Sequence, residues 1–264
     1  MFILKLILVP AFLLLVSLAG RRWGPNVAGW LAGLPVVVGP ILFFIAVERG
    51  ASFASGAAVA SLAAVFASIS FSVAYAHTSQ RCCWPVALFA GLFAWALAAF
   101  LLSLFTASVV FSCFIATSTL LSAARLFPRV HAPQLVRSVS AVDLALRMAA
   151  GALLTVWVTL AAGTLGSQWS GLLAVFPVLG IVLAVFSHRS QGSAFAASLL
   201  RAMVSGLYSF SVFCLVLAVA LPSVGIPIAF TLSVALAVAV QFFTRRHLAP
   251  PSSGLPVDAA QAKL

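Results

Sequence analysis

The chain has 264 residues, of which 64% are hydrophobic and only 6% are charged, and its mean hydropathy is +1.24. Soluble domains carry about 25% charged residues, so this composition excludes an ordinary soluble domain and indicates a membrane protein. The formal net charge of +11 is spread over several short loops, which disfavours nucleic-acid binding.

The apolar segments predict about nine transmembrane helices. A helix needs roughly 20 apolar residues to cross a bilayer, and its backbone must satisfy its own hydrogen bonds there. The apolar run Trp84–Ala124 is too long for one crossing, so we divide it at Ser103–Thr106. In chain order, the predicted spans are 2–19, 27–47, 52–76, 85–103, 106–123, 144–162, 169–187, 194–219 and 226–244. The predicted fold class is therefore all-α, a polytopic membrane protein.

Basic residues predict the side of the membrane that each loop faces. With nine spans, one side carries Lys5 and Arg49 alone. The other side carries Arg21, Arg22, Arg81, Arg125, Arg129, Arg137, Arg189, Arg245 and Arg246. Because basic loops stay in the cytoplasm, we expect a bacterial inner-membrane protein with a periplasmic N-terminus and a cytoplasmic C-terminus. Anionic lipid headgroups are the expected partners of the basic side.

The two halves of the chain match each other at a constant offset of 142 positions. The most informative matches are those of glycine and proline: Gly24 with Gly166, Gly29 with Gly171, Pro35 with Pro177, Gly50 with Gly192 and Pro85 with Pro227. We expect two four-helix repeats, 1–104 and 143–246, joined by a connecting helix and basic loop at 105–142. Because one unpaired helix separates the copies, the second copy should be inverted in the membrane. The polar tail 247–264 is expected to be disordered.

Short motifs relate the halves to a known family. Ala28-Gly29, Pro35 and Glu48-Arg49-Gly50 have the spacing of the motif in the GlpM family of small inner-membrane proteins. The chain resembles a fused, duplicated form of that family, although Ser190-Gln191 replaces Glu-Arg in the second half. The resemblance implies a membrane role linked to glycerol-phosphate metabolism or to production of the exopolysaccharide alginate. It implies no catalytic residues.

Residues that could carry catalysis are few. Of the three acids, Glu48 and Asp143 are expected at opposite membrane faces, and Asp258 lies in the tail. They therefore cannot form a carboxylate pair. The adjacent thiols Cys82-Cys83 have only His77 nearby, which is too few ligands for a structural zinc site. We expect no enzymatic activity, no cofactor and no metal.

Two predicted helices contain residues that break helices. Pro35, Gly39 and Pro40 interrupt the second helix, and Pro177 and Gly180 interrupt the seventh. Proline lacks an N–H group and leaves a carbonyl unpaired, which in lipid must face protein, water or a cavity. Paired interruptions in equivalent helices indicate a substrate site near the bilayer midplane. The alternative is a pair of packing kinks with close helix contacts.

The eighth predicted helix carries further candidates for a substrate site. Arg201 lies roughly two turns into this helix, where an anionic substrate would be its natural partner. The alternative is that its side chain reaches the cytoplasmic interface. Tyr208 and Ser209 are candidates to line a polar path, or they bond to carbonyls of their own or a neighbouring helix.

Four charged residues are expected at helix ends, at the membrane interfaces. Asp143 and Arg147 stand four residues apart on one predicted helix, so we expect them to form an ion pair. Glu48 and Arg49 are expected at the opposite interface.

The sequence favours transport of a small or amphiphilic metabolite by alternating access of two inverted repeats. The alternative is a non-transporting membrane partner, as a homodimer or with another protein of an envelope-polysaccharide or lipid pathway. A polar, wetted cavity between the second and seventh helices would favour transport, and a dry, closely packed interface would favour the alternative.

Overall fold

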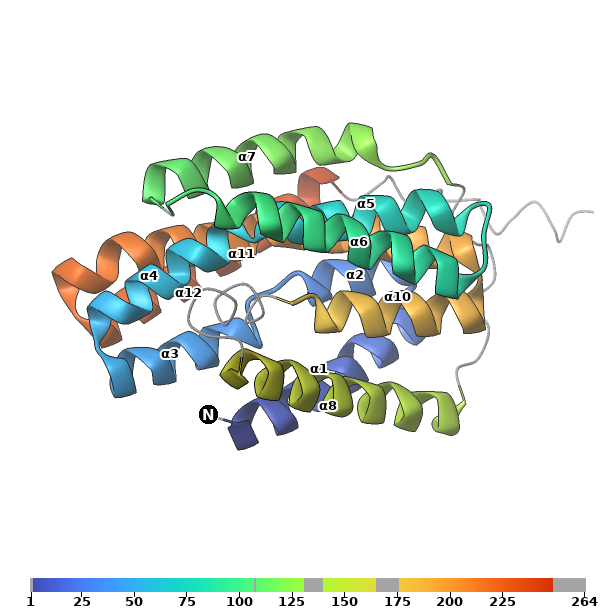
Figure 1. Cartoon of the computed structure of the whole chain (residues 1–264), viewed down its shortest axis with the longest axis horizontal. Helices are drawn as coiled ribbons and strands as arrows, with labels where there is room; N and C mark the ends of the chain where they lie inside the picture. Colours follow the sequence, from blue (N-terminus) through green and yellow to red (C-terminus); the bar gives the residue numbers. More distant parts are fainter. Residues whose placement is uncertain (1, 107, 131–139, 165–175, 249–264) are drawn as a thin grey trace, which may run out of the picture.

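The computed structural model describes residues 2–106, 108–130, 140–164 and 176–248, and in this part of the chain every regular element is a helix. The helices are α1 (Phe2–Trp23), α2 (Pro25–Ala32), α3 (Val38–Arg49), α4 (Ala51–Ala63), α5 (Val65–Ser79), α6 (Trp84–Ser103), α7 (Val109–Leu126), α8 (Ala141–Thr164), α10 (Val178–Gln191), α11 (Ser193–Val224) and α12 (Ile226–Leu248). The longer helices run side by side along one direction (Figure 1).

Seven segments of the described chain are long and apolar enough to cross a membrane. They comprise α1, α4 with α5, α6, α7, α8, α11 and α12. The prediction of a polytopic helical membrane protein is therefore confirmed. The count of nine spans additionally requires the second and seventh predicted helices to cross, and it stays a prediction.

The second predicted helix, 27–47, is two helices in the structure. α2 ends at Ala32, α3 begins at Val38, and Pro35 lies in the gap, where no helical hydrogen bond needs its missing N–H. The carbonyl of Pro35 accepts a hydrogen bond from the Gly39 amide at 2.7 Å. Pro40 does not interrupt α3, because it lies in the first turn, where backbone N–H groups have no intrahelical partner.

The seventh predicted helix is described only from residue 176 onwards. Pro177 is the N-cap of α10, which begins at Val178. Gly180 is the third residue of α10, so it too lies in a first turn. The remainder of this predicted helix, 169–175, lies outside the described residues, as do 131–139 of the predicted loop and 249–264 of the predicted tail.

Several helix boundaries recur at the offset of 142 positions found in the sequence. Gly50 caps the C-terminal end of α3 and Gly192 that of α10, and these glycines have positive φ angles of 89° and 94°. Glycine adopts such angles without steric penalty, so at both positions the chain can turn sharply into the next helix. The first residues of α6 and α12, Trp84 and Ile226, are also 142 positions apart. The turn from α3 to α4 and the turn from α10 to α11 lie at opposite ends of the bundle, at the left and the right of Figure 1.

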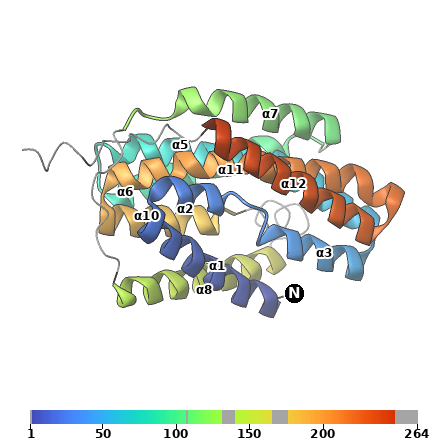
Figure 2. The same cartoon turned by 180° about the vertical axis from the view of Figure 1, so that it is seen from behind.

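α11 forms the centre of the bundle. It contacts α2, α4, α5, α7, α10 and α12, and the reverse view shows α2 and α12 lying against it (Figure 2). The contact with α2 is especially close, since a Cβ atom on Gly33 would lie 2.5 Å from both the Gly206 Cα and the Met203 carbonyl oxygen. Small residues spaced four apart, Gly29 and Gly33, allow this approach of two backbones.

The peripheral helices present large apolar side chains outward. Phe89 and Phe93 on α6 are 73% and 63% exposed, and Phe114 on α7 is 71% exposed. Exposed apolar surface of this extent is unusual for a soluble monomer and suits contact with lipid.

The contact between α2 and α11 gives a testable expectation for stability. Gly33→Ala should lower the free energy of unfolding by about 1–3 kcal/mol, because its methyl group would overlap the backbone of α11. Gly56→Ala on α4 is the matched control, since its Cβ would meet nothing within 4 Å and Ala favours a helix. Thermal unfolding in detergent should show a lower melting temperature for Gly33→Ala alone. Equal melting temperatures for the two variants would contradict the close contact.

Candidate functional site

A cavity of about 270 Å³ lies between the α2–α3 gap and the start of α10. One wall comes from the α2–α3 gap and its flanks, with Gly33, Leu34 and Val38 among the lining residues. The facing wall comes from the start of α10, residues 176–180. This volume is slightly below the range of about 300–1,000 Å³ that is typical of small-molecule sites.

The remaining walls of the cavity are mostly apolar. Side chains from α1, α5, α8 and α11 contribute Val9, Val65, Ser68, Thr155, Val158, Thr159, Met203, Leu207 and Phe210. The Thr155 hydroxyl donates to the Gly151 carbonyl and the Thr159 hydroxyl to the Thr155 carbonyl, each at 2.7 Å. These hydroxyl hydrogens are therefore used within α8, and only oxygen lone pairs are left to face an occupant.

The cavity includes some of the residues predicted for a substrate site and leaves out others. Pro177 and Gly180 line it. Pro35, Gly39 and Pro40 do not, but their neighbours on the same segment do. The α2–α3 gap and the start of α10 therefore border one space, although an interruption at Pro177 and substrate binding there stay predictions.

The candidates on α11 lie away from the cavity. The Tyr208 hydroxyl donates to the Leu120 carbonyl of α7 at 3.0 Å, and the Ser209 hydroxyl donates to the Ala237 carbonyl of α12 at 2.8 Å. For these two residues, the alternative of hydrogen bonds to neighbouring helices describes the structure. Arg201 has an exposed side chain on α11 and does not line the cavity.

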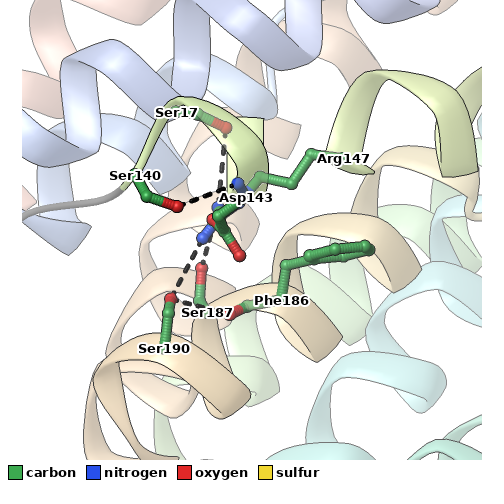
Figure 3. Close-up of polar contacts among 7 residues, drawn as sticks. All are labelled: Ser17, Ser140, Asp143, Arg147, Phe186, Ser187 and Ser190. Carbon is green, nitrogen blue, oxygen red and sulfur yellow. Dashed lines mark hydrogen bonds and ion pairs between the residues drawn. The ribbon is translucent and has the colours of Figure 1, made fainter. Parts of the chain in front are cut away.

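Asp143 and Arg147 form the predicted ion pair. Arg147 Nε donates to Asp143 Oδ2 at 2.7 Å, and the Asp143 amide donates to the Ser140 hydroxyl that caps α8, at 3.1 Å (Figure 3). The Arg147 side chain is only 4% exposed, because it is packed against α1 and α10. Its position at a membrane interface stays a prediction.

Three serines and one aromatic ring surround the Arg147 guanidinium group. Nη1 lies 3.5 Å from the Ser17 hydroxyl of α1 and 3.4 Å from the Ser187 hydroxyl of α10, and Nη2 lies 3.2 Å from the Ser190 hydroxyl (Figure 3). Its carbon lies 5.8 Å from the centre of the Phe186 ring. We call this group, with Asp143, the Arg147 cluster.

The Arg147 cluster connects α1, α8 and α10 at one end of the bundle. Only about 10 Å³ of free space adjoins Arg147, which is close to the minimum for one water molecule. The guanidinium group is already paired with a carboxylate and three hydroxyls, so the cluster serves to join helices rather than to receive a ligand. The four-residue spacing revealed the ion pair, but nothing local in the sequence revealed Ser17 and Ser187 as further partners.

The other predicted interfacial pair lies at the end of α3. Glu48 and Arg49 are both exposed, and the Arg49 guanidinium carbon lies 5.7 Å from the centre of the Phe53 ring. Among the described residues, no three His, Cys, Asp or Glu side chains are grouped so that they could hold a metal ion.

The Arg147 cluster predicts an asymmetric response to mutation. Asp143→Asn should lower the free energy of unfolding by about 1–3 kcal/mol, because it leaves a buried arginine without its counter-charge. This value is below that of fully buried pairs, since the Asp143 side chain is 21% exposed. The double variant Asp143→Asn/Arg147→Met should regain part of the loss. Chemical or thermal unfolding in detergent measures both, with the exposed Glu48→Gln as the neutral control, and an equal loss in the control would contradict this role.

Comparisons with known proteins identify no relative of this chain. No family model matches the sequence, and no curated protein and no solved structure matches it significantly. The resemblance to the GlpM family thus rests on the short motifs between Ala28 and Gly50 and on their partial counterparts in the second half.

Proposed function

We propose that this protein is a transporter that moves a small apolar or amphiphilic molecule across a bacterial inner membrane. The observation that carries the proposal is the cavity bordered by the α2–α3 gap and by the start of α10, where Pro177 lies. Irregular backbone at membrane depth is tolerated where it faces protein or lines a cavity, and paired broken helices of this kind commonly form substrate sites in transporters.

The proposed architecture is nine spans in two inverted repeats. The seven long apolar segments, together with α2–α3 and the segment ending in α10, would make nine crossings. Inversion is supported by the equivalent turns at Gly50 and Gly192, which have matching backbone geometry and lie at opposite ends of the bundle (Figure 1). The orientation is supported by charge, because basic loops favour the cytoplasm. The Arg189 end is then cytoplasmic, and the N-terminus is periplasmic.

The cavity lining indicates the class of substrate. The described lining residues include no charged side chain, and their polar groups are three hydroxyls, from Ser68, Thr155 and Thr159. A charged substrate would lose its hydration there without compensation, which is costly in an apolar environment. An apolar or amphiphilic molecule with a hydrogen-bond donor suits these walls better.

Alternating access requires that one end of the cavity close while the other opens. In the proposed mechanism, the Arg147 cluster closes the end at which α1, α8 and α10 meet. Opening that end would separate Ser17 from Ser187, and both lie within hydrogen-bond range of the same guanidinium nitrogen. The Asp143–Arg147 pair lies within α8 and would survive such a movement, so the charge would not become unpaired.

A non-transporting partner of an envelope-polysaccharide or lipid pathway is the second candidate function. It is favoured by the predominantly apolar lining, because a wetted, polar cavity was the expected mark of transport. In that case the cavity would be a packing defect filled by a lipid tail. Access to the cavity from the two sides of the membrane separates the candidates.

Orientation is tested with single cysteines in a chain whose four native cysteines are replaced. Arg49→Cys should react with a membrane-impermeant thiol reagent only from the periplasmic side, and Arg189→Cys only from the cytoplasmic side. Both side chains are exposed at helix ends, so each position should be reachable. Reaction of the two positions from the same side would contradict the inverted arrangement.

Access to the cavity is tested in the same cysteine-free chain. Thr159→Cys, which lines the cavity, should react from both sides of the membrane, in separately prepared right-side-out and inverted vesicles, because the cavity opens to each side in turn. Ser233→Cys is the matched control, since Ser233 is fully buried on α12 away from the cavity and should not react. Reaction of Thr159→Cys from one side only, or from neither, would reject alternating access and favour the non-transporting role.

A further inference from the structure

We propose that the groove between α6, α8 and α10 is a binding site for one anionic phospholipid. The groove has a volume of about 380 Å³ and is lined entirely by apolar side chains, among them Leu88, Leu153, Trp157, Val185 and Phe186. It is separate from the cavity at the helix interruptions, since the two share no lining residue. The proposal is therefore independent of transport.

An acyl chain suits the body of this groove. Leu153 and Trp157 on α8 are 71% and 59% exposed, so the groove opens outward. In a bilayer, lipid tails are the apolar molecules that surround such a surface. A fixed concave surface can hold one of these tails in preference to the others by van der Waals contact.

The end of the groove specifies the headgroup. Trp84 precedes Leu88 by four residues on α6, and Arg189 follows Val185 by four residues on α10, so each lies one helical turn beyond the apolar lining. The Arg189 guanidinium carbon lies 5.6 Å from the centre of the Trp84 ring. Stacking on tryptophan orients a guanidinium group while leaving its N–H groups able to bind phosphate.

The exposed basic side chains near this end of the groove are Arg189, which stacks on Trp84, and Arg81 in the turn three residues before Trp84. Arg147 lies behind Phe186, but its charge is balanced by Asp143. The His188 ring is turned toward the Tyr75 hydroxyl, with Nδ1 and the hydroxyl oxygen 3.2 Å apart. Among the described residues, no carboxylate lies within ion-pair distance of Arg189, whose side chain is exposed. A lipid phosphate with no balancing amine is the complementary partner.

The site is tested on the purified full-length protein in detergent. Phosphatidylglycerol at about ten times its Kd should raise the melting temperature by about 3–6 °C. Phosphatidylcholine with the same acyl chains should raise it less, because its choline group offsets the phosphate charge. Phosphatidylglycerol with brominated tails should also quench tryptophan fluorescence more than brominated phosphatidylcholine, since Trp157 lines the groove.

Two variants and one ion complete the test. Arg189→Gln should reduce the effect of phosphatidylglycerol to that of phosphatidylcholine, whereas Arg201→Gln, which removes an exposed arginine that does not contact the groove, should leave it unchanged. Inorganic phosphate alone should not stabilise the protein. Equal effects of the two lipids, equal losses in the two variants, or full stabilisation by phosphate alone would each overturn the proposal. If Arg189→Gln does not fold, the comparison of tryptophan quenching by the two brominated lipids in the wild-type protein decides the proposal instead.

Discussion

The need to satisfy backbone hydrogen bonds away from water governs this structure. A helix does so within itself, which is why nearly all of the described chain is helical. The gap between α2 and α3 departs from this pattern within the described chain, and its Gly33 end is packed against α11 while Val36 is 37% exposed. The neighbouring helix α2 is held against α11 by glycine contacts, and the Gln241 side chain of α12 donates to the Trp30 carbonyl at 3.0 Å. The α2 end of this irregular segment is thus held by contacts with both α11 and α12.

Several polar side chains in the described interior connect neighbouring helices. The Ser55 hydroxyl of α4 donates to the Ala218 carbonyl at 2.7 Å, and Tyr208 and Ser209 make comparable bonds to α7 and α12. All three bonds involve α11, so the central helix is held by directional bonds as well as by packing. Without a hydrophobic driving force between helices in lipid, such bonds and close contacts determine which faces meet.

The sequence predicted helices well because hydropathy and helix-breaking residues act locally. The observed starts of α4, α6 and α11 fall within one residue of the predicted starts, and α3 begins after the predicted interruption at Pro35. The Asp143–Arg147 ion pair could be predicted for the same reason, because the two residues are four positions apart on one helix. The sequence could not predict the burial of Arg147 between helices, or which carbonyls accept the bonds of the Tyr208 and Ser209 hydroxyls. These depend on helices that are distant in the chain, and no pattern within one helix encodes its neighbours.

The unpaired helix α7 has a consequence for how the two halves can evolve. If the halves are inverted copies, separate four-helix chains would have to insert in both orientations in equal numbers to build the same assembly. Fusing the two halves through one additional transmembrane helix gives one half in each orientation per chain. A single sequence then no longer needs balanced loop charges that would let it insert both ways. Each half could then specialise for its own membrane face: Ser190, at the position equivalent to Glu48, contacts Arg147.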